Sequence, residues 1–215
     1  MKQIIKGKEP PEFTIWKEHF RQENGREPCY ADFRETPEWS ALIQTLLEEQ
    51  GYICCYCMQR ISGWDSHMEH FIPRAIRNTD PHSARASDVE LNYTNLLESC
   101  NGEHADRTHC GRAKDCDSNP TLLSPVSDRI EDRFCYKLDG SIDATDAEDS
   151  AAMSTIRILN LNSVALKRHR KTAIFEALSS DEPTEDLIRQ YSGKDESGAF
   201  APYCTAILRA LKTCL

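Results

Sequence analysis

Hydrophobic residues recur at helical spacing in the first 50 residues of the chain. Between Ser40 and Gln50 they occupy positions 42, 43, 46 and 47, which form one stripe on an α-helix. Thr36 followed by Pro37 is typical of a helix start, because threonine can cap the first turn and proline fits the first helical position. This segment therefore predicts helices, with the following apolar anchors: Trp16, Phe20, Phe33, Trp39, Leu42, Leu46 and Leu47.

The pattern changes after residue 50 and becomes helical again near residue 146. Turns, histidines and cysteines fill residues 51–120, and the acidic run DGSIDATDAED at 139–149 predicts a loop or linker. Apolar positions then recur at Ile156, Leu159, Leu166, Ile174 and Leu178, and a last helix is predicted over Ala201–Leu211. We expect a helical segment at 1–50, a middle core at 51–120 and a helical segment at 121–215, which together form one compact body.

Composition and charge narrow the class of protein. Of the 215 residues, 28% are charged and 39% are hydrophobic, which is typical of a soluble globular chain. There is no apolar run of roughly 18 residues that could span a membrane, and the polar start lacks a signal-peptide core. We therefore expect a cytoplasmic protein without a membrane partner. The net charge of −9 argues against binding nucleic acid over the whole surface, but it is compatible with a small basic cleft.

Ten cysteines without an export signal favour metal binding over a disulfide framework. Cys54 and Cys57 form a C-x-x-C pair, a spacing that lets two thiolates at one turn bind the same tetrahedral zinc ion. The best candidates for the second pair are Cys100 and Cys110, so we expect a structural Zn²⁺ in a zinc knuckle. For the fourth ligand the alternatives are His104, His109, Cys116 and Cys55.

Between the cysteine pairs, Glu69-His70-Phe71-Ile72-Pro73 resembles the first part of an HNH nuclease signature. Hydrolysis of a phosphodiester needs a base to deprotonate water and a divalent cation to offset the charge that develops on the phosphate. Neutral His70 can accept the proton, and the Glu69 carboxylate is a suitable ligand for Mg²⁺ or Mn²⁺. On a plain strand the two side chains point to opposite sides, so they can serve one centre only if a loop or bulge re-aims them.

Asn95 precedes Cys100 by five residues, in the N-L-x-x-x-C spacing of the same signature. Its side-chain amide is expected to tie the loop that carries His70 and so to orient the base. We therefore group Asn95 with the catalytic residues.

Basic residues surround this motif in an otherwise acidic chain, as a nuclease cleft requires. We select Arg74, Arg112 and Lys114 as nucleic-acid-binding residues from a wider group that also holds Arg60, Arg77 and Arg107. A second basic run, Lys167–Lys171, is expected on a helix, where it could contact nucleic acid or an acidic partner.

Over most of its length the chain resembles the PtuB-like HNH endonucleases that occur beside retrons and in Septu-type anti-phage systems. The segments that carry the resemblance are MKQIIKGKEPPEF, LLEEQGYICCYCMQRI, MEHFIPRA, NLLESCNGEH, HCGRAKD and TIRILNLN with the basic LKRHRK after it. The resemblance implies a ββα-metal nuclease that acts in phage defence with a PtuA-like ATPase. In retron versions a reverse transcriptase and its RNA–DNA product also belong to the complex.

The motifs and the resemblance together predict an α+β, mainly helical fold. Its centre is a ββα-metal (HNH) core with a zinc knuckle, flanked by N- and C-terminal helices. One position departs from the family pattern. Many HNH sequences place the last metal ligand, Asn or His, directly after the second cysteine, but Gly111 stands there in this chain. Asn101 directly follows Cys100 and is the replacement that we select, with His104, His109 and Asp115 as competitors.

Two other functions remain compatible with the sequence. The activated water could attack RNA, such as tRNA, because the chemistry is shared by both backbones and the sequence holds no readable base-recognition code. Alternatively, the chain could be a zinc-stabilised module that binds nucleic acid or protein without catalysis, in which case His70 is merely structural.

Overall fold

The computed structural model describes residues 1–74, 89–102, 109–114 and 121–213. The described chain is an α+β protein dominated by helices, as the sequence predicted, and it contains two small antiparallel sheets. Its elements in chain order are α1 (Pro11–Asn24), α2 (Tyr30–Phe33), α3 (Pro37–Glu49), β1 (Ser66–His70), the 3-10 helix η2 (Tyr93–Asn95), β2 (Leu96–Cys100), α5 (Gly111–Lys114), the 3-10 helix η3 (Ile130–Arg133), β3 (Phe134–Tyr136), β4 (Ile142–Ala144), α6 (Ser150–Ile158), α7 (Val164–Leu178), α8 (Thr184–Ser192) and α9 (Cys204–Thr213).

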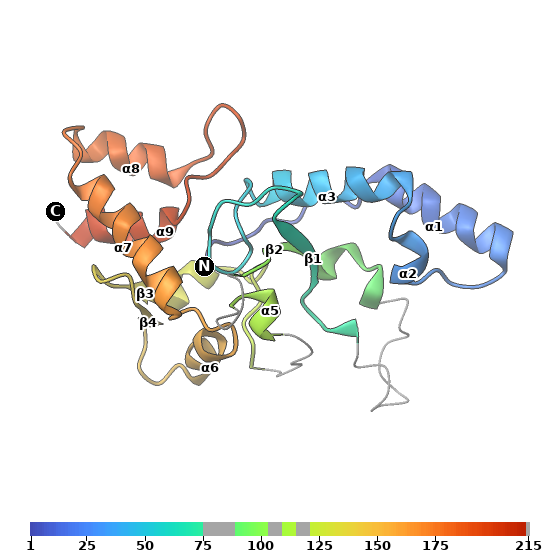
Figure 1. The fold of residues 1–215 in the computed structure, drawn as a ribbon, viewed down its shortest axis with the longest axis horizontal. Coiled ribbons are helices and arrows are strands. Elements are labelled where there is room, and N and C mark those ends of the chain that lie inside the picture. The colour runs from blue at the N-terminus through green and yellow to red at the C-terminus, as the bar shows by residue number, and fades with distance from the viewer. Residues whose placement is uncertain (75–88, 103–108, 115–120, 214–215) are drawn as a thin grey trace.

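Helices α1–α3 lie at one end of the molecule and α6–α9 at the other, with β1, β2 and α5 between them (Figure 1). None of the helices in the described ranges is both long and apolar enough to cross a membrane.

The predicted helix stripe forms in α3, where Leu42, Leu46 and Leu47 are buried. The helix begins at Pro37, as expected, and Thr36 has the extended backbone of a capping residue. The Thr36 hydroxyl, however, makes no capping hydrogen bond. The start of α3 is therefore set by backbone conformation and by proline at the first helical position.

A core of aromatic and aliphatic side chains joins the N-terminal helices to the middle of the chain. Phe13 of α1 and Phe33 of α2 pack with ring centroids 4.7 Å apart. The same buried cluster includes Met68 of β1 and Leu96 of β2. One face of the β1–β2 pair is thereby held against the N-terminal helices.

Strands β1 and β2 pair antiparallel from Ser66↔Cys100 to His70↔Leu96 without a bulge. Side chains on a strand alternate between its two faces. Met68 therefore lies on the side of the N-terminal helices, whereas Leu97 of β2 belongs to the larger core that extends through the C-terminal segment. Helix α5 begins at Gly111, directly after Cys110, so the cysteine and the helix are placed together.

The acidic segment 139–149 was predicted as a loop or linker, but it contains strand β4. Ile142 is buried and lies opposite Tyr136 of β3 in the register of the second sheet. Three consecutive residues, Ile142–Ala144, suffice for this short pairing. Acidic side chains outside the strand dominate the composition and conceal it.

The basic run Lys167–Lys171 lies on α7, as predicted, but one of its members points inward. Arg170 is 1% exposed, and its guanidinium donates hydrogen bonds to the carbonyl oxygens of Gly140 and Leu161, each at 2.6 Å. Arg170 therefore ties α7 to the second sheet and is not a surface contact for a partner. The interpretation of the run as one continuous basic patch is wrong at this residue.

Candidate metal centre and active site

The sulfur atoms of Cys54, Cys57, Cys100 and Cys110 lie within 4.8 Å of one another, and all four residues are buried. Sulfurs bound at about 2.3 Å to one tetrahedral zinc ion lie roughly 3.8 Å apart. The Sγ atoms of Cys57 and Cys100 are separated by 3.8 Å. The predicted cysteines thus form a group that could hold a metal ion such as zinc.

Backbone geometry brings these thiols together from three parts of the chain. Cys54 and Cys57 lie on a tight turn that Met58 closes with a positive φ of 65°, Cys100 ends β2 and Cys110 precedes α5. The Cys100 amide donates to Cys54 Sγ at 3.3 Å. Burial raises the pKa of a thiol, but hydrogen bonds with the neighbouring cysteines hold the pKa of Cys54 well below its usual value. A thiolate is the form that binds a metal ion.

The alternative ligands take other positions. Cys55 is buried but does not belong to the group of sulfurs. His109 lies beside the group, with Nδ1 3.2 Å from Cys110 Sγ and 3.7 Å from Cys100 Sγ, where it can donate a hydrogen bond to sulfur. His104 and Cys116 lie outside the described residues.

Glu69 on β1 faces α5 and is 6% exposed. Its Oε1 accepts hydrogen bonds from Lys114 Nζ at 2.7 Å and from the Tyr56 hydroxyl at 2.9 Å, and its Oε2 lies 3.6 Å from His67 Nε2. Burial raises the pKa of this carboxyl, but the contacts with His67, Lys114 and Tyr56 outweigh burial and lower the pKa overall. Glu69 is therefore a charged carboxylate that keeps one oxygen directed toward His67.

Lys114 does not occupy the position expected of a nucleic-acid contact. The residue is 2% exposed, and its ammonium group donates to Glu69 Oε1 and, at 2.8 Å, to the carbonyl oxygen of His70. A buried and paired ammonium cannot reach a phosphate at the surface. In this structure Lys114 instead fixes the carboxylate of Glu69 and the backbone at the end of β1.

His70 lies at the end of β1, and its ring contacts a different set of residues from those around Glu69. The His70 Nε2 atom lies 2.9 Å from the carbonyl oxygen of Glu90, and the ring meets Tyr30 edge-on at 5.0 Å between centroids. Because a carbonyl only accepts, Nε2 carries the proton and Nδ1 keeps its lone pair. Burial lowers the pKa of His70 to about 4, so the ring is neutral at physiological pH.

The strand has no bulge that turns Glu69 and His70 to one side, although the sequence suggested that one centre would need such a feature. The carboxylate lies toward α5, and the histidine ring lies toward Tyr30 and Glu90. The structure thus places the two predicted residues next to each other in the chain but among different neighbours.

Asn95 brackets the segment that follows His70. Its Oδ1 accepts from the Ile72 amide at 2.7 Å, and its Nδ2 donates to the carbonyl oxygens of Ile72 at 3.1 Å and Val89 at 2.9 Å. A single side chain therefore connects the chain on both sides of residues 75–88. This geometry gives Asn95 a means of holding the backbone next to His70.

We expect Asn95→Ala to lower the free energy of unfolding by about 1–3 kcal/mol, since part-buried backbone groups of Ile72 and Val89 lose their hydrogen-bond partner. Cleavage of nucleic acid should decrease as well, while the zinc content stays unchanged. The matched control is Asn92→Ala, because Asn92 is exposed and caps only Thr94. Denaturant unfolding and a cleavage assay on both variants check this prediction, which fails if the two variants behave alike.

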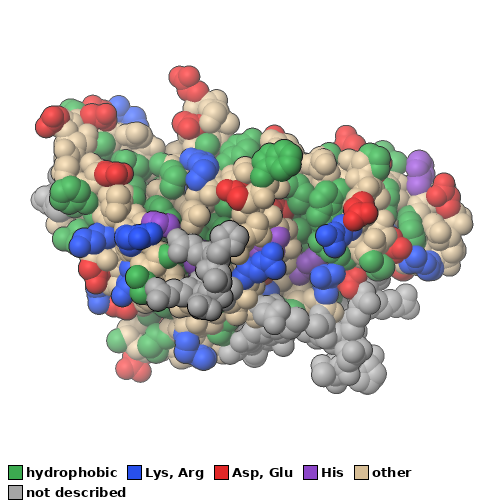
Figure 2. All heavy atoms as spheres, in the orientation of Figure 1, with side chains coloured by type: hydrophobic (Ala, Val, Ile, Leu, Met, Phe, Trp, Pro, Cys, Tyr) green, Lys and Arg blue, Asp and Glu red, His purple; other side chains and the backbone are tan. Residues whose placement is uncertain are grey.

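The remaining predicted residues lie at the surface. Asn101 is exposed, and its Oδ1 lies 3.1 Å from His67 Nδ1 and 3.4 Å from the Arg112 guanidinium. The guanidinium of Arg74 stacks on the Tyr30 ring at 4.2 Å, beside His70. Lysine, arginine and histidine side chains gather across the middle of the face in Figure 2.

The other basic residues named from the sequence either bind backbone carbonyl oxygens or lie outside the described residues. Arg60 donates to the carbonyl oxygens of Gly51, Tyr52 and Phe200, so it holds backbone segments together. Residues that lie outside the described ranges are Arg77, Arg107 and the competing ligand Asp115.

His67 is the residue of this site that the sequence analysis did not select. It lies two positions before Glu69 on β1, and on a strand such residues share one face. The signal was therefore present as the alternation H-x-E in His67–Glu69. Burial lowers the pKa of His67, but the contact with Glu69 outweighs it, so that the pKa is raised from 6.5.

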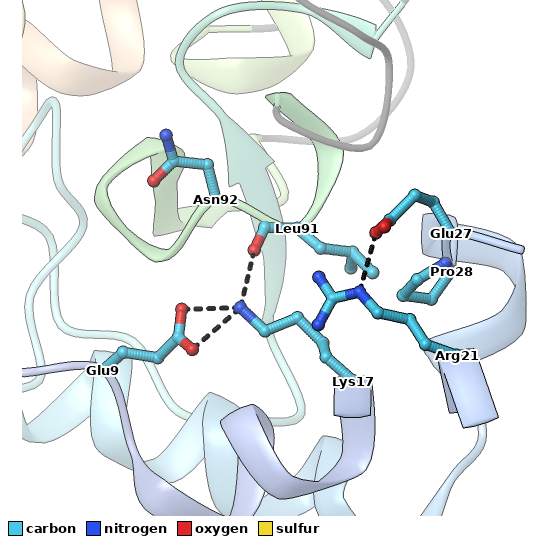
Figure 3. A pocket seen from close by; sticks show the side chains of 7 residues that line it. All are labelled: Glu9, Lys17, Arg21, Glu27, Pro28, Leu91 and Asn92. Carbon is cyan, nitrogen blue, oxygen red and sulfur yellow. Dashed lines mark hydrogen bonds and ion pairs between the residues drawn. The ribbon is translucent and has the colours of Figure 1, made fainter. Parts of the chain in front are cut away.

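A hollow of about 290 Å³ lies apart from this site, between α1 and the segment that precedes η2 (Figure 3). Its charged groups bind each other. Lys17 Nζ contacts Glu9 Oε1 at 2.7 Å, and Arg21 Nε donates to Glu27 Oε2 at 2.9 Å. These pairs leave no charge that favours a particular ligand, so we assign the hollow no function.

The described site thus holds two antiparallel strands, a short helix that follows Cys110, a group of four cysteines, and an acidic residue with histidines on the first strand. Comparison with known proteins supports the class of HNH nucleases. No family model matches the chain. A protein of Vibrio cholerae serotype O1 biovar El Tor named "Retron Vc95 putative HNH endonuclease" is 29% identical to this chain over 129 residues. The match covers 58% of this chain, which spans about 59% of the length of that curated relative. The comparison confirms the resemblance to HNH endonucleases of the retron-associated type.

Proposed function

We propose that the protein is a metal-dependent HNH endonuclease that hydrolyses phosphodiester bonds, with DNA as the favoured substrate. The observation that carries the proposal is the charged, buried Glu69 carboxylate beside His67, on the strand that ends in the neutral and oriented His70. A carboxylate that can bind a cation and an imidazole that can accept a proton are the groups that this hydrolysis requires.

In the proposed mechanism, His70 Nδ1 takes the proton from the attacking water. Its hydrogen bond from Nε2 to the Glu90 carbonyl fixes the tautomer, and Asn95 holds the neighbouring backbone. The ring and the carboxylate have different neighbours and no bulge turns them to one side, so this mechanism requires the substrate phosphate to lie at the end of β1 and to contact both groups there. A divalent cation, Mg²⁺ or Mn²⁺, would neutralise charge on the phosphate and on the leaving oxygen.

Glu69 is the proposed cation ligand, and Lys114 keeps its carboxylate in place through Oε1. Arg74 and Arg112 are exposed on the two sides of the site and are the proposed contacts to the phosphates of nucleic acid. Structural zinc is the proposed occupant of the cysteine group, since zinc commonly binds four thiolates at a closed tetrahedral site.

Cleavage assays test the activity directly. The purified protein, with and without its partner, is incubated with DNA and with RNA in Mg²⁺, Mn²⁺ or chelator. We expect cleavage that depends on the added cation. Cleavage of RNA alone would support the alternative substrate, and a folded protein that retains its zinc but cuts neither substrate under any of these conditions would support a non-catalytic zinc module.

We further propose that the nuclease is a cytoplasmic effector of anti-phage defence that works with a PtuA-like ATPase. In a retron setting, a reverse transcriptase and its RNA–DNA product would join the complex. The support is the resemblance to retron-associated HNH endonucleases together with the charge of −9, because 35 acidic residues outnumber 26 lysines and arginines and oppose binding to phosphates outside the site. A larger partner could provide that affinity.

The isolated chain is expected to bind DNA weakly at physiological salt, with a dissociation constant above about 10⁻⁵ M, in the weak part of the non-specific range. Co-expression with the genomic neighbour should yield a stable complex in size-exclusion chromatography, and that complex should cut faster than the free chain. If the two co-expressed proteins elute separately and the free chain cuts nucleic acid efficiently by itself, the partner proposal is wrong.

A further inference from the structure

We propose that His67 is the second protein ligand of the catalytic cation, bound through Nε2 together with Glu69 Oε2 in the space that Gly111 leaves open. This inference rests on the proposed nuclease function but concerns a different property, the composition of the metal site. It assigns a role to a side chain that the HNH signature does not include.

The spacing of the two ligand atoms fits one small cation. His67 Nε2 and Glu69 Oε2 are 3.6 Å apart. Two ligand atoms at about 2.1 Å from an octahedral ion, at a right angle to each other, lie roughly 3.0 Å apart. A small inward movement of either side chain is therefore enough to bind the ion. Lys114 and Tyr56 occupy Oε1, so the oxygen directed toward His67 is the one that remains for the cation.

Asn101 determines which nitrogen of His67 can bind the cation. The Asn101 side-chain oxygen lies 3.1 Å from His67 Nδ1, and an amide oxygen can only accept. Nδ1 therefore carries a proton, and Nε2, once it has given up its own proton, presents its lone pair toward Glu69. A histidine ligand in proteins commonly donates its other ring N–H to such an acceptor, which fixes the ring and its tautomer. Asn101, the tentative ligand from the sequence, then acts as a positioning residue.

Gly111 supplies the space. A Cβ atom at this position would lie 2.6 Å from Glu69 Oε2 and 2.7 Å from His67 Nε2, so it would come between the two ligand atoms. Many HNH sequences place their last metal ligand at this point of the chain. Here the helix contributes no side chain, and His67 approaches the same place from the strand. In this proposal His67 takes the place of the ligand that position 111 does not provide.

The test is a titration of the zinc-loaded full-length protein with Mn²⁺, in which electron paramagnetic resonance measures free Mn²⁺. We compare the wild type with His67→Ala, Asn101→Ala and Gly111→Ala. The controls are His70→Gln, which changes the proposed base, and His19→Ala, which removes an exposed histidine on α1. Zinc content and the melting temperature of each variant report whether the fold is retained.

We expect His67→Ala to weaken Mn²⁺ binding at least tenfold and Asn101→Ala to weaken it by about 10-fold or more, the loss typical when a histidine ligand loses its supporting hydrogen bond. Gly111→Ala should also weaken binding, because the methyl group separates two flexible side-chain ends without disturbing the backbone. The His70→Gln and His19→Ala variants should bind Mn²⁺ as the wild type does.

Binding at wild-type strength by a folded His67→Ala variant overturns the inference, and the inference fails equally if the wild type binds no Mn²⁺. Wild-type Mn²⁺ binding combined with lost cleavage in His67→Ala would make His67 a proton-transfer group instead. If Mn²⁺ binding depends on His67 but no nucleic acid is ever cut, the metal site stands and the proposed nuclease function fails.

Discussion

The His70→Ala variant is expected to cleave nucleic acid about 10²- to 10⁴-fold more slowly than the wild type, the usual loss when a general base is removed. His70 is the last residue of β1, and its neutral ring is held by the Glu90 carbonyl with Nδ1 left as the proton acceptor. Single-turnover cleavage at saturating cation measures the effect on the chemical step.

A second substitution, His70→Gln, separates proton transfer from packing. Glutamine can still donate a hydrogen bond to the Glu90 carbonyl, but it has no group that accepts a proton near neutral pH. Both variants should keep their zinc, and the glutamine variant, which retains the hydrogen bond to Glu90, should keep a melting temperature close to that of the wild type. Should the glutamine variant cut at near-wild-type rate, His70 is not the base, and His67 or His104 becomes the candidate.

Cys57→Ser is expected to lower the free energy of unfolding by more than about 4 kcal/mol, in the range reached when a bound metal is lost. For a chain of this size that corresponds to a drop in Tm of roughly 10 °C or more. The turn at residues 54–58, the end of β2 and the start of α5 are joined through this group inside the larger buried core, so loss of the metal would release three segments of that core together. Cleavage should be lost together with stability.

The matched control is Cys55→Ser, since Cys55 is a buried neighbour that lies outside the group of four sulfurs. We expect a smaller loss of stability and an unchanged content of one zinc ion per chain. Elemental analysis and thermal unfolding check both variants. Equal effects of Cys55→Ser and Cys57→Ser would mean that the cysteines act by packing and that no metal is held there.

Features carried by short-range spacing could be predicted from the sequence. The C-x-x-C turn at Cys54 and Cys57 needs only two residues between its thiols. The helix stripe at Leu42, Leu46 and Leu47 likewise depends on local periodicity. Each of these features depends only on residues that are close together in the sequence.

Features that depend on how distant segments meet could not be predicted. In the sequence nothing distinguishes Lys114 from an exposed lysine. Its ammonium group contacts Glu69 only because α5 packs against β1. Arg170 reads as part of a charged run, but the carbonyls that bind it come from residues 9 and 30 positions away. His67 could have been predicted, because its spacing from Glu69 places both residues on one face of a strand. That Gly111 leaves room beside them is known only once α5 is placed against β1.

The placement of α5 also determines which insertions the chain can tolerate. Cys110 precedes the helix, and Lys114, its last residue, meets Glu69. Each residue of an α-helix turns the chain by about 100°. One residue added between Cys110 and Lys114 would therefore swing the ammonium away from the carboxylate, although every side chain of the site would still be present. Length variation among related chains should be absent from this stretch, however freely their other segments differ in length.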